Sequence, residues 1–233
     1  DRNGFRHTVM PSLRQLGMRP NAVVLTHPDG HHLGGGAAVW EAFPIREAVM
    51  PVTLSRSTGY RSWMANPSGM NMRLAGEVGS MDLPDGARLE VVHAPDPLAQ
   101  NARADDRVAV YRLHWRGWKI LFTSDVGTST ENQVLEAGAD VSADVIVAGC
   151  HRNDLSLGDA FLHAVAPRAI VFSNPAFPPE EHRSDETVGY WKSRGIEVID
   201  QCVVGGVTIT VDDHGDLRLA GFLQDEPIML KRR

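Results

Sequence analysis

The sequence predicts a layered fold that combines strands and helices, in the α/β or α+β class, and two observations support this prediction. Short apolar runs typical of buried strands alternate with segments of helical spacing along most of the chain. In addition, Arg116-Gly117 joins two strand-like runs and has the length of a tight β-hairpin turn, so some neighbouring strands are antiparallel. Because no internal repeat divides the chain, we expect residues 1–233 to form one domain.

The first part of the chain predicts alternating helices and strands. A helix is expected over residues 7–16, where Gly17 provides a stop signal. A buried strand at residues 23–25 is followed by a helix over 37–43 and a strand over 48–52. Glycine and proline interrupt the pattern between residues 55 and 81, and we expect an irregular insertion there.

The remainder of the chain is richer in strands. The expected strands are residues 89–93, 108–115, 118–122, 145–147, 169–172, 197–199, 207–211 and 217–222. The expected helices are residues 131–137, 160–165 and 187–194, and residues 212–215 have the composition of a turn.

The composition is that of a globular chain with a full core. Of the 233 residues, 42% are hydrophobic and 22% charged, and the net charge is −6. This charge argues against tight non-specific binding of nucleic acid by the whole surface, but not against a nuclease whose metal ions supply local positive charge. Neither a signal peptide nor an apolar run of about 18 residues is found. With two cysteines, Cys150 and Cys202, the sequence allows at most one disulfide and does not decide whether it forms.

The strongest candidate site is the stretch from Thr26 to Gly35, which directly follows a buried strand. It concentrates imidazole and carboxylate side chains, which are the residues His27, Asp29, His31 and His32. A strand end followed by a short loop allows such side chains to converge on a divalent metal ion. The alternative is a solvated polar loop.

This stretch, Thr26-His27-Pro28-Asp29-Gly30-His31-His32-Leu33-Gly34-Gly35, resembles the metal-binding motif of the metallo-β-lactamase superfamily, Thr/Ser-His-x-His/Asp-x-Asp-His-x-Gly-Gly. With Asp29 at the third ligand place, it looks most like the C-terminal domain of the ComEC-type competence proteins, which take DNA across the bacterial membrane. His31 departs from the pattern, because the family usually has an Asp there that serves the second metal.

The resemblance implies an α+β fold, the four-layer αββα sandwich, here without the N-terminal hairpin that precedes this motif in the family. It also implies that the chain is a fragment of a longer protein. This segment would be soluble, and the membrane-embedded remainder of the same chain would lie in the bacterial plasma membrane.

Later parts of the chain match further ligand places of the family. His93 stands where the family reads Val-Leu-His-Pro, and Asp125 where it reads Leu-Leu-Thr-Gly-Asp, whose Asp bridges the two metals. Cys150 and His151 stand at the His-His pair of Asp-Val-Leu-Lys-Val-Pro-His-His-Gly-Ser, so a cysteine replaces the first histidine. As alternatives, His93 is a hydrogen-bonded residue at a strand end, and Asp125 caps the following helix.

Five further histidines have no supporting neighbours in the sequence. His182 falls near a late His-Pro element of the family, and we interpret it as a surface residue. The others are interpreted as structural or surface residues, namely His7, His114, His163 and His214.

The activity implied by the resemblance is metal-dependent hydrolysis of phosphodiesters. Up to two zinc or manganese ions, about 3.5–4 Å apart, would lower the pKa of a shared water. His27, Asp29 and one later ligand would hold the first ion, with Asp29 also orienting the water, and Asp125 would bridge. His31, His32 and one of Cys150 and His151 would hold the second ion. Both residues that depart from the family pattern, His31 and Cys150, are candidates for this ion.

Two other functions stay open. One is a degenerate, non-catalytic domain that binds DNA or assists assembly, motivated by His31 and Cys150. The other is a hydrolase of a small ester or thioester. Nucleic acid is the expected substrate of the first hypothesis, and the sequence identifies no protein partner.

Overall fold

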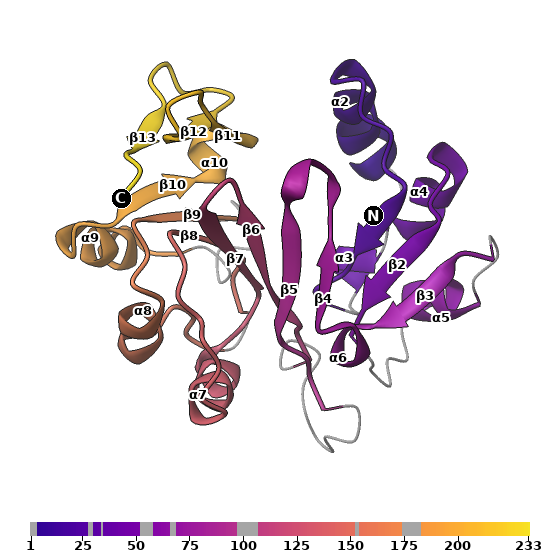
Figure 1. Cartoon of the computed structure of the whole chain (residues 1–233), viewed down its shortest axis with the longest axis horizontal. Helices are drawn as coiled ribbons and strands as arrows, with labels where there is room; N and C mark the ends of the chain where they lie inside the picture. The colour runs from indigo at the N-terminus through magenta and orange to yellow at the C-terminus, as the bar shows by residue number, and fades with distance from the viewer. Residues whose placement is uncertain are drawn as a thin grey trace. The chain divides into compact units, whose positions relative to one another are not determined.

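The computed structural model describes residues 4–27, 30–33, 35–51, 58–65, 69–96, 107–151, 154–173 and 183–233. Its contacts divide the chain into two compact units, which are described separately. The first comprises Asp1–Gly79 with His93–Ala109, and the second Ser80–Val92 with Val110–Arg233. Figure 1 shows helices and strands mixed in both units, so the predicted α+β class is confirmed.

The first unit is built on three parallel strands in the order β1-β2-β3. Its elements are η1 (Phe5–Val9), α2 (Met10–Gln15), β1 (Ala22–Val24), α3 (Gly30–Leu33), α4 (Gly36–Ala42), β2 (Glu47–Met50), α5 (Thr58–Met64), β3 (Asn71–Leu74) and α6 (Ala75–Val78). A continuous helical segment therefore occupies the predicted range 7–16, and Gly17 follows it with φ 69°. Helices in the connections are what parallel neighbouring strands require.

The prediction of an irregular insertion over residues 55–81 was wrong. Described parts of this range form α5, β3 and α6, while residues 52–57 and 66–68 lie outside the described residues. Tyr60 and Trp63, one helical turn apart, are buried in the same core as Ala48 and Met50 of β2. The i, i+3 spacing of the two aromatic residues is the signal that the glycine and proline pattern concealed.

The second unit contains a large sheet of seven strands in the order β10-β9-β8-β7-β6-β5-β4. Its strands are β4 (Ser80–Asp82), β5 (Arg88–His93), β6 (Val110–Trp115), β7 (Trp118–Ser124), β8 (Val145–Ala148), β9 (Ala169–Phe172) and β10 (Glu197–Asp200). β7 to β10 are parallel neighbours, and β6 pairs with β7 antiparallel. The hairpin turn is as predicted, with positive φ at both Arg116 (50°) and Gly117 (85°).

A small antiparallel sheet covers one face of the large sheet and helices cover the other (Figure 1). The small sheet is β11 (Val207–Val211), β12 (Leu217–Gly221) and β13 (Ile228–Leu230), and the helices on the other side are α7 (Thr128–Glu136), α8 (Asp159–Val165) and α9 (Asp185–Ser193). The short element η2 (Pro84–Gly86) joins β4 to β5, and α10 (Gln201–Val204) follows β10 and packs with the small sheet through Val204. Ile120 packs with Leu219 of the small sheet, whereas Phe172 contacts Trp191 of α9 with ring centroids 5.5 Å apart. Burial on both faces explains why these strands are continuous apolar runs.

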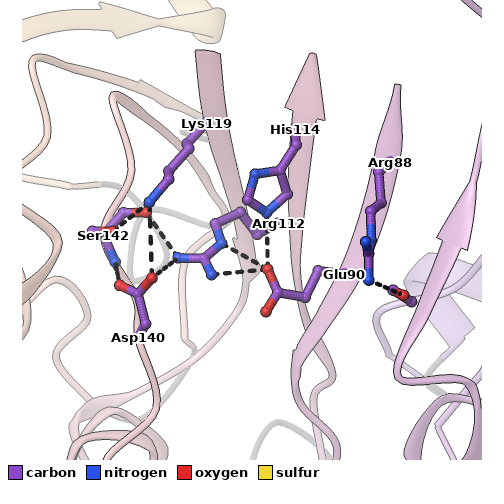
Figure 2. Close-up of polar contacts among 8 residues, drawn as sticks. Arg88, Glu90, Arg112, His114, Lys119, Asp140 and Ser142 are labelled. Carbon is purple, nitrogen blue, oxygen red and sulfur yellow. Dashed lines mark hydrogen bonds and ion pairs between the residues drawn. The ribbon is translucent and has the colours of Figure 1, made fainter. Parts of the chain in front are cut away.

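A network of charged side chains crosses β5, β6 and the chain after α7 (Figure 2). Arg112 is only 4% exposed, and its Nε and Nη2 donate to Glu90 Oε2 at 3.0 and 2.8 Å. Its Nη1 lies 3.0 Å from Asp140 Oδ2 and donates to the Ser142 carbonyl at 3.1 Å. His114 Nε2 lies 2.9 Å from the same Glu90 oxygen. His114 is therefore a structural residue, which is one of the two predicted alternatives, and its partner lies on another strand.

His7, His163 and His214 are exposed, as predicted, and His182 lies outside the described residues. The expectation of one domain and of a missing N-terminal hairpin stays a prediction. Across the described ranges, no helix is long and apolar enough to cross a membrane.

The network predicts a specific loss of stability in acid. Desolvation raises the pKa of Glu90, but hydrogen bonds from His114 and Arg112 outweigh it and lower the pKa. Hydrogen bonds from Ser142, and then from Arg112, hold the pKa of Asp140 well below its usual value. Both carboxylates therefore contribute stability that is present above their ordinary pKa values and lost as the pH falls through the lowered ones.

We expect Arg112→Met to lower the free energy of unfolding at pH 7 by about 1–3 kcal/mol, because several hydrogen bonds to charged groups are lost. It should also flatten the decline of stability between about pH 5 and pH 3. Urea unfolding at each pH measures both effects. Arg88→Met is the matched control, because among the described residues Arg88 donates to the hydroxyl of Ser80 and not to a carboxylate. An unchanged acid profile in Arg112→Met would contradict the account.

Candidate metal centre

The first half of the candidate site lies at the end of β1. Leu25 donates its N–H to the Val49 carbonyl at 2.8 Å, so the chain stays on the sheet one residue beyond β1. His27 follows with a fully buried side chain (0% exposed), and the solvated-loop alternative is therefore wrong for this residue. His31 and His32 lie in α3, although the side chain of His31, like all of Asp29, is outside the described part of the structure.

His27 and His32 converge. Their ring centroids are 4.7 Å apart, and each can present a ring nitrogen within 4.8 Å of the other's. Two nitrogens bound to one tetrahedral zinc ion would be about 3.4 Å apart, since each Zn–N bond is about 2.0–2.1 Å long. A small side-chain adjustment therefore lets both imidazoles bind one ion, and the nitrogen donors of this pair fit zinc.

In the second unit, Asp125 lies directly after β7, as predicted. Ser124, the residue before it, has φ 51° in the left-handed region. The resembled family has glycine at this place, which adopts such a conformation without strain. The left-handed residue ends the strand and turns the chain, so that Asp125 does not simply continue the alternation of β7.

Gly149 has no side chain, and this leaves room for the Asp125 carboxylate. A Cβ atom added to Gly149 would overlap Asp125 Oδ1, so the carboxylate occupies space that any other residue would fill. Gly149 also donates its N–H to the Ser124 carbonyl at 2.8 Å, which ties the ends of β7 and β8 together. The alternative that Asp125 is the N-cap of the following helix is wrong, because the N-cap of α7 is Gly127.

Cys150 and His151 follow β8, also as predicted. His151 is buried (4% exposed), while Cys150 is more accessible and its thiol lies 3.8 Å from the His151 carbonyl oxygen. Both cysteines of the chain are thiols, so the disulfide left open by the composition does not form. A thiol and an imidazole are both competent zinc ligands once the thiol is deprotonated.

His93 ends β5, at the position predicted from its alternating strand. Desolvation lowers the pKa of His93, which favours the neutral imidazole at neutral pH. Neutral imidazole is the form that binds metal ions. The alternative of a strand-end histidine without a metal role stays open.

Sequence reasoning missed the residues that support these candidates. Gly149 and Gly127 give room to Asp125 and His151, since a Cβ on Gly127 would lie 2.9 Å from His151 Cδ2. Glu131 of α7 is 2% exposed, although a helical Glu is ordinarily a surface residue. A glycine shortly after each strand end was the signal available for the first two, and nothing in the spacing distinguished Glu131.

Comparison with known proteins defines the class of fold. No family model matches the chain. A metallo hydrolase from the hyperthermophilic archaeon Ignicoccus hospitalis KIN4/I is 15% identical with a TM-score of 0.53, over 92% of this chain and 81% of that chain. A mutant CmlA β-hydroxylase is 10% identical with a TM-score of 0.54, over 78% of this chain and 43% of that chain. These identities show the fold alone, and the chain shares its fold with this metallo hydrolase.

One curated protein matches this chain in sequence. The chain is 21% identical over 178 residues to ComE operon protein 3 of Bacillus subtilis (strain 168). The match covers 71% of this chain and 21% of that protein, so the chain spans about a fifth of the length of this relative. Its name fits the resemblance to competence proteins that the motif of the first unit predicts.

Gly149→Ala tests the placement of Asp125. The added methyl group must displace the carboxylate, so we expect a loss of about 1–3 kcal/mol in the free energy of unfolding, as for other overpacked sites. We also expect weaker binding of zinc, measured by competition with a chromophoric chelator. The control is Gly189→Ala in α9, where nothing lies within 4 Å of an added Cβ. Equal zinc affinity in the Gly149 variant and the wild type would count against Asp125 as a ligand.

Proposed function

We propose that the chain is a metal-dependent hydrolase of the metallo-β-lactamase superfamily that acts on phosphodiesters. The observation that carries the proposal is the convergence of the buried His27 with His32 at the end of a strand. The fold shared with a metallo hydrolase supports it, since that fold is a known scaffold for such a protein. The order of the candidate ligands along the sequence supports it further.

The residues that would hold the metal are those of the sequence motifs. His27 and Asp29 would hold one ion, and Asp125 would bridge to a second ion held by His32, with His31 and one of Cys150 and His151. His93 is a further candidate. The inclusion of Asp125 with these histidines rests on the resemblance of the sequence. Bound metal would supply a Lewis acid and lower the pKa of a water molecule towards about 7.

The chain's own residues have separate tasks in this proposal. The buried setting of His27 excludes water from its nitrogen atoms and holds the ring in one orientation. Asp29 would orient the attacking water by accepting a hydrogen bond from it. Asp125 would supply two oxygen donors from one short side chain, which Gly149 leaves room to accommodate. Oxygen, nitrogen and sulfur donors together suit zinc, whereas manganese is favoured by oxygen-rich sets.

We also propose a role in DNA uptake, with this chain as one segment of a longer, membrane-embedded bacterial protein. The support is the match to ComE operon protein 3, of which the chain spans only a part. The net charge of −6 makes local attraction by bound metal important, because the overall surface charge repels phosphate. DNA is therefore expected to engage the site rather than the whole surface.

A non-catalytic domain is the second candidate function. Two residues favour it, because His31 replaces an Asp and Cys150 replaces a His of the family pattern. Both belong to the proposed second metal. A domain of this kind would keep the fold and at most one ion, and it would bind DNA or assist assembly without cleaving the phosphodiester.

Metal content separates these functions. We expect purified protein to carry up to two equivalents of zinc or manganese by elemental analysis, and His32→Ala to lose at least one, because one imidazole of the convergent pair is removed. His214→Ala, at an exposed turn histidine, is the matched control and should lose none. Cleavage of bis(p-nitrophenyl) phosphate and of single-stranded DNA should fall with the metal. A folded protein without metal would exclude the hydrolase, and one ion without cleavage would favour the non-catalytic domain.

A further inference from the structure

The chain that follows His151 is attached to the first turn of α7. Asp154 Oδ2 accepts the Ser129 N–H at 3.2 Å. The Leu155 carbonyl accepts both the N–H and the hydroxyl of Thr128, at 2.8 and 3.0 Å. Because α7 begins at Thr128, only a short connection separates this turn from Asp125. The same helical turn is thus linked to two of the candidate ligand segments of the second unit.

Glu131 completes this attachment from inside the protein. Its side chain is buried, and its Oε1 accepts the Leu157 N–H at 2.5 Å while Oε2 accepts the Gly158 N–H at 3.0 Å. Burial is the largest influence on the pKa of Glu131 and raises it, although the two backbone hydrogen bonds act in the opposite direction. Both oxygens therefore serve main-chain donors, which would otherwise be buried without acceptors.

The geometry at Leu157 shows why such a partner is needed. Leu157 has φ 60°, a left-handed conformation that is unfavourable for a branched side chain. Its side chain is nevertheless buried (4% exposed). A strained residue in a buried loop persists only where its surroundings hold it, and Glu131 supplies the acceptors at this residue and at the next one.

The restraint is transmitted to His151. Ser156, which directly precedes Leu157, accepts the His151 N–H on its Oγ at 3.4 Å. The His151 ring also lies against Gly127, at the N-terminus of α7. Displacing Leu157 and Gly158 would therefore move Ser156 and release one of the contacts that hold the His151 backbone.

We propose that Glu131 is a positioning residue, whose buried carboxylate holds residues 156–158 so that His151 is presented as a metal ligand beside Asp125. This inference rests on the proposed function, because it takes His151 and Asp125 as ligands. Glu131 itself does not bind the metal in this role. It acts through the main chain, in the way that outer residues of metal sites orient the ligands.

The test compares three variants of α7. Glu131→Gln preserves shape but turns one acceptor into a donor, so one of the two main-chain N–H groups loses its partner. Glu136→Gln makes the same change at an exposed residue of the same helix. Val134→Ala removes methyl groups from a residue that is 1% exposed and destabilises α7 without touching residues 156–158 through a hydrogen bond.

We expect Glu131→Gln to weaken zinc affinity about 10- to 100-fold, measured by chelator competition, as for other residues that orient metal ligands. Glu136→Gln should match the wild type. Val134→Ala should lower Tm while leaving zinc affinity within about twofold of the wild type. Zinc affinity that falls equally in Val134→Ala and Glu131→Gln would overturn the positioning role, because the effect would follow stability alone. Unchanged affinity in Glu131→Gln would also overturn it.

Two measurements on metal-free protein keep the inference separate from the proposed function. Amide hydrogen exchange at Leu157 and Gly158 should accelerate at least tenfold in Glu131→Gln, because a protecting acceptor is lost. In a Cys202→Ser background, labelling of the Cys150 thiol should also accelerate. If the wild type binds no zinc, the proposed function fails, and unchanged exchange and labelling would then overturn the positioning of this segment as well.

Discussion

Burial of the large sheet on both faces is the constraint on which the candidate site depends. Ile120 of β7 packs towards the small sheet, while Leu121, the next residue, is buried on the helix side. A shift of one residue would reverse both, so the register of β7 against β8 is strongly specified. Because these strands are parallel neighbours, their carboxyl ends meet at one edge, where Asp125 and Cys150-His151 follow. The position of these side chains is thus a consequence of core packing.

At that edge, the backbone makes room for polar groups by using conformations that are otherwise costly. Ser124 is left-handed, Gly149 leaves space that the Asp125 carboxylate fills, and Leu157 is left-handed within a buried loop. Ser124 and Leu157 depart from ordinary strand or loop geometry, and all three residues lie within a few residues of a candidate ligand. Local strain of this kind is concentrated at functional sites in proteins, where the surrounding structure holds it in place.

Much of this arrangement could be predicted from the sequence. The strands β7, β8 and β9 of the large sheet were predictable because burial on both faces requires continuous apolar runs, whereas β4 was not predicted. His27 and Asp125 were predictable as candidates because each closely follows an apolar run. The helix containing Tyr60 and Trp63 was not predicted, since nearby glycine and proline outweighed two aromatic residues in the pattern. The role of Glu131 was not predictable, because its partners are 26 and 27 residues away and become neighbours only in the folded chain.

The central claim is that His27 and His32 are ligands of a metal centre. Anomalous scattering at the zinc edge, from crystals of the protein grown with zinc, tests this claim most directly. The account predicts a strong anomalous peak within bonding distance of ring nitrogens of both histidines, at about 2.0–2.1 Å. A second peak would establish the two-ion site. Zinc found only at exposed histidines such as His214, with no peak beside His27 and His32, would contradict the account.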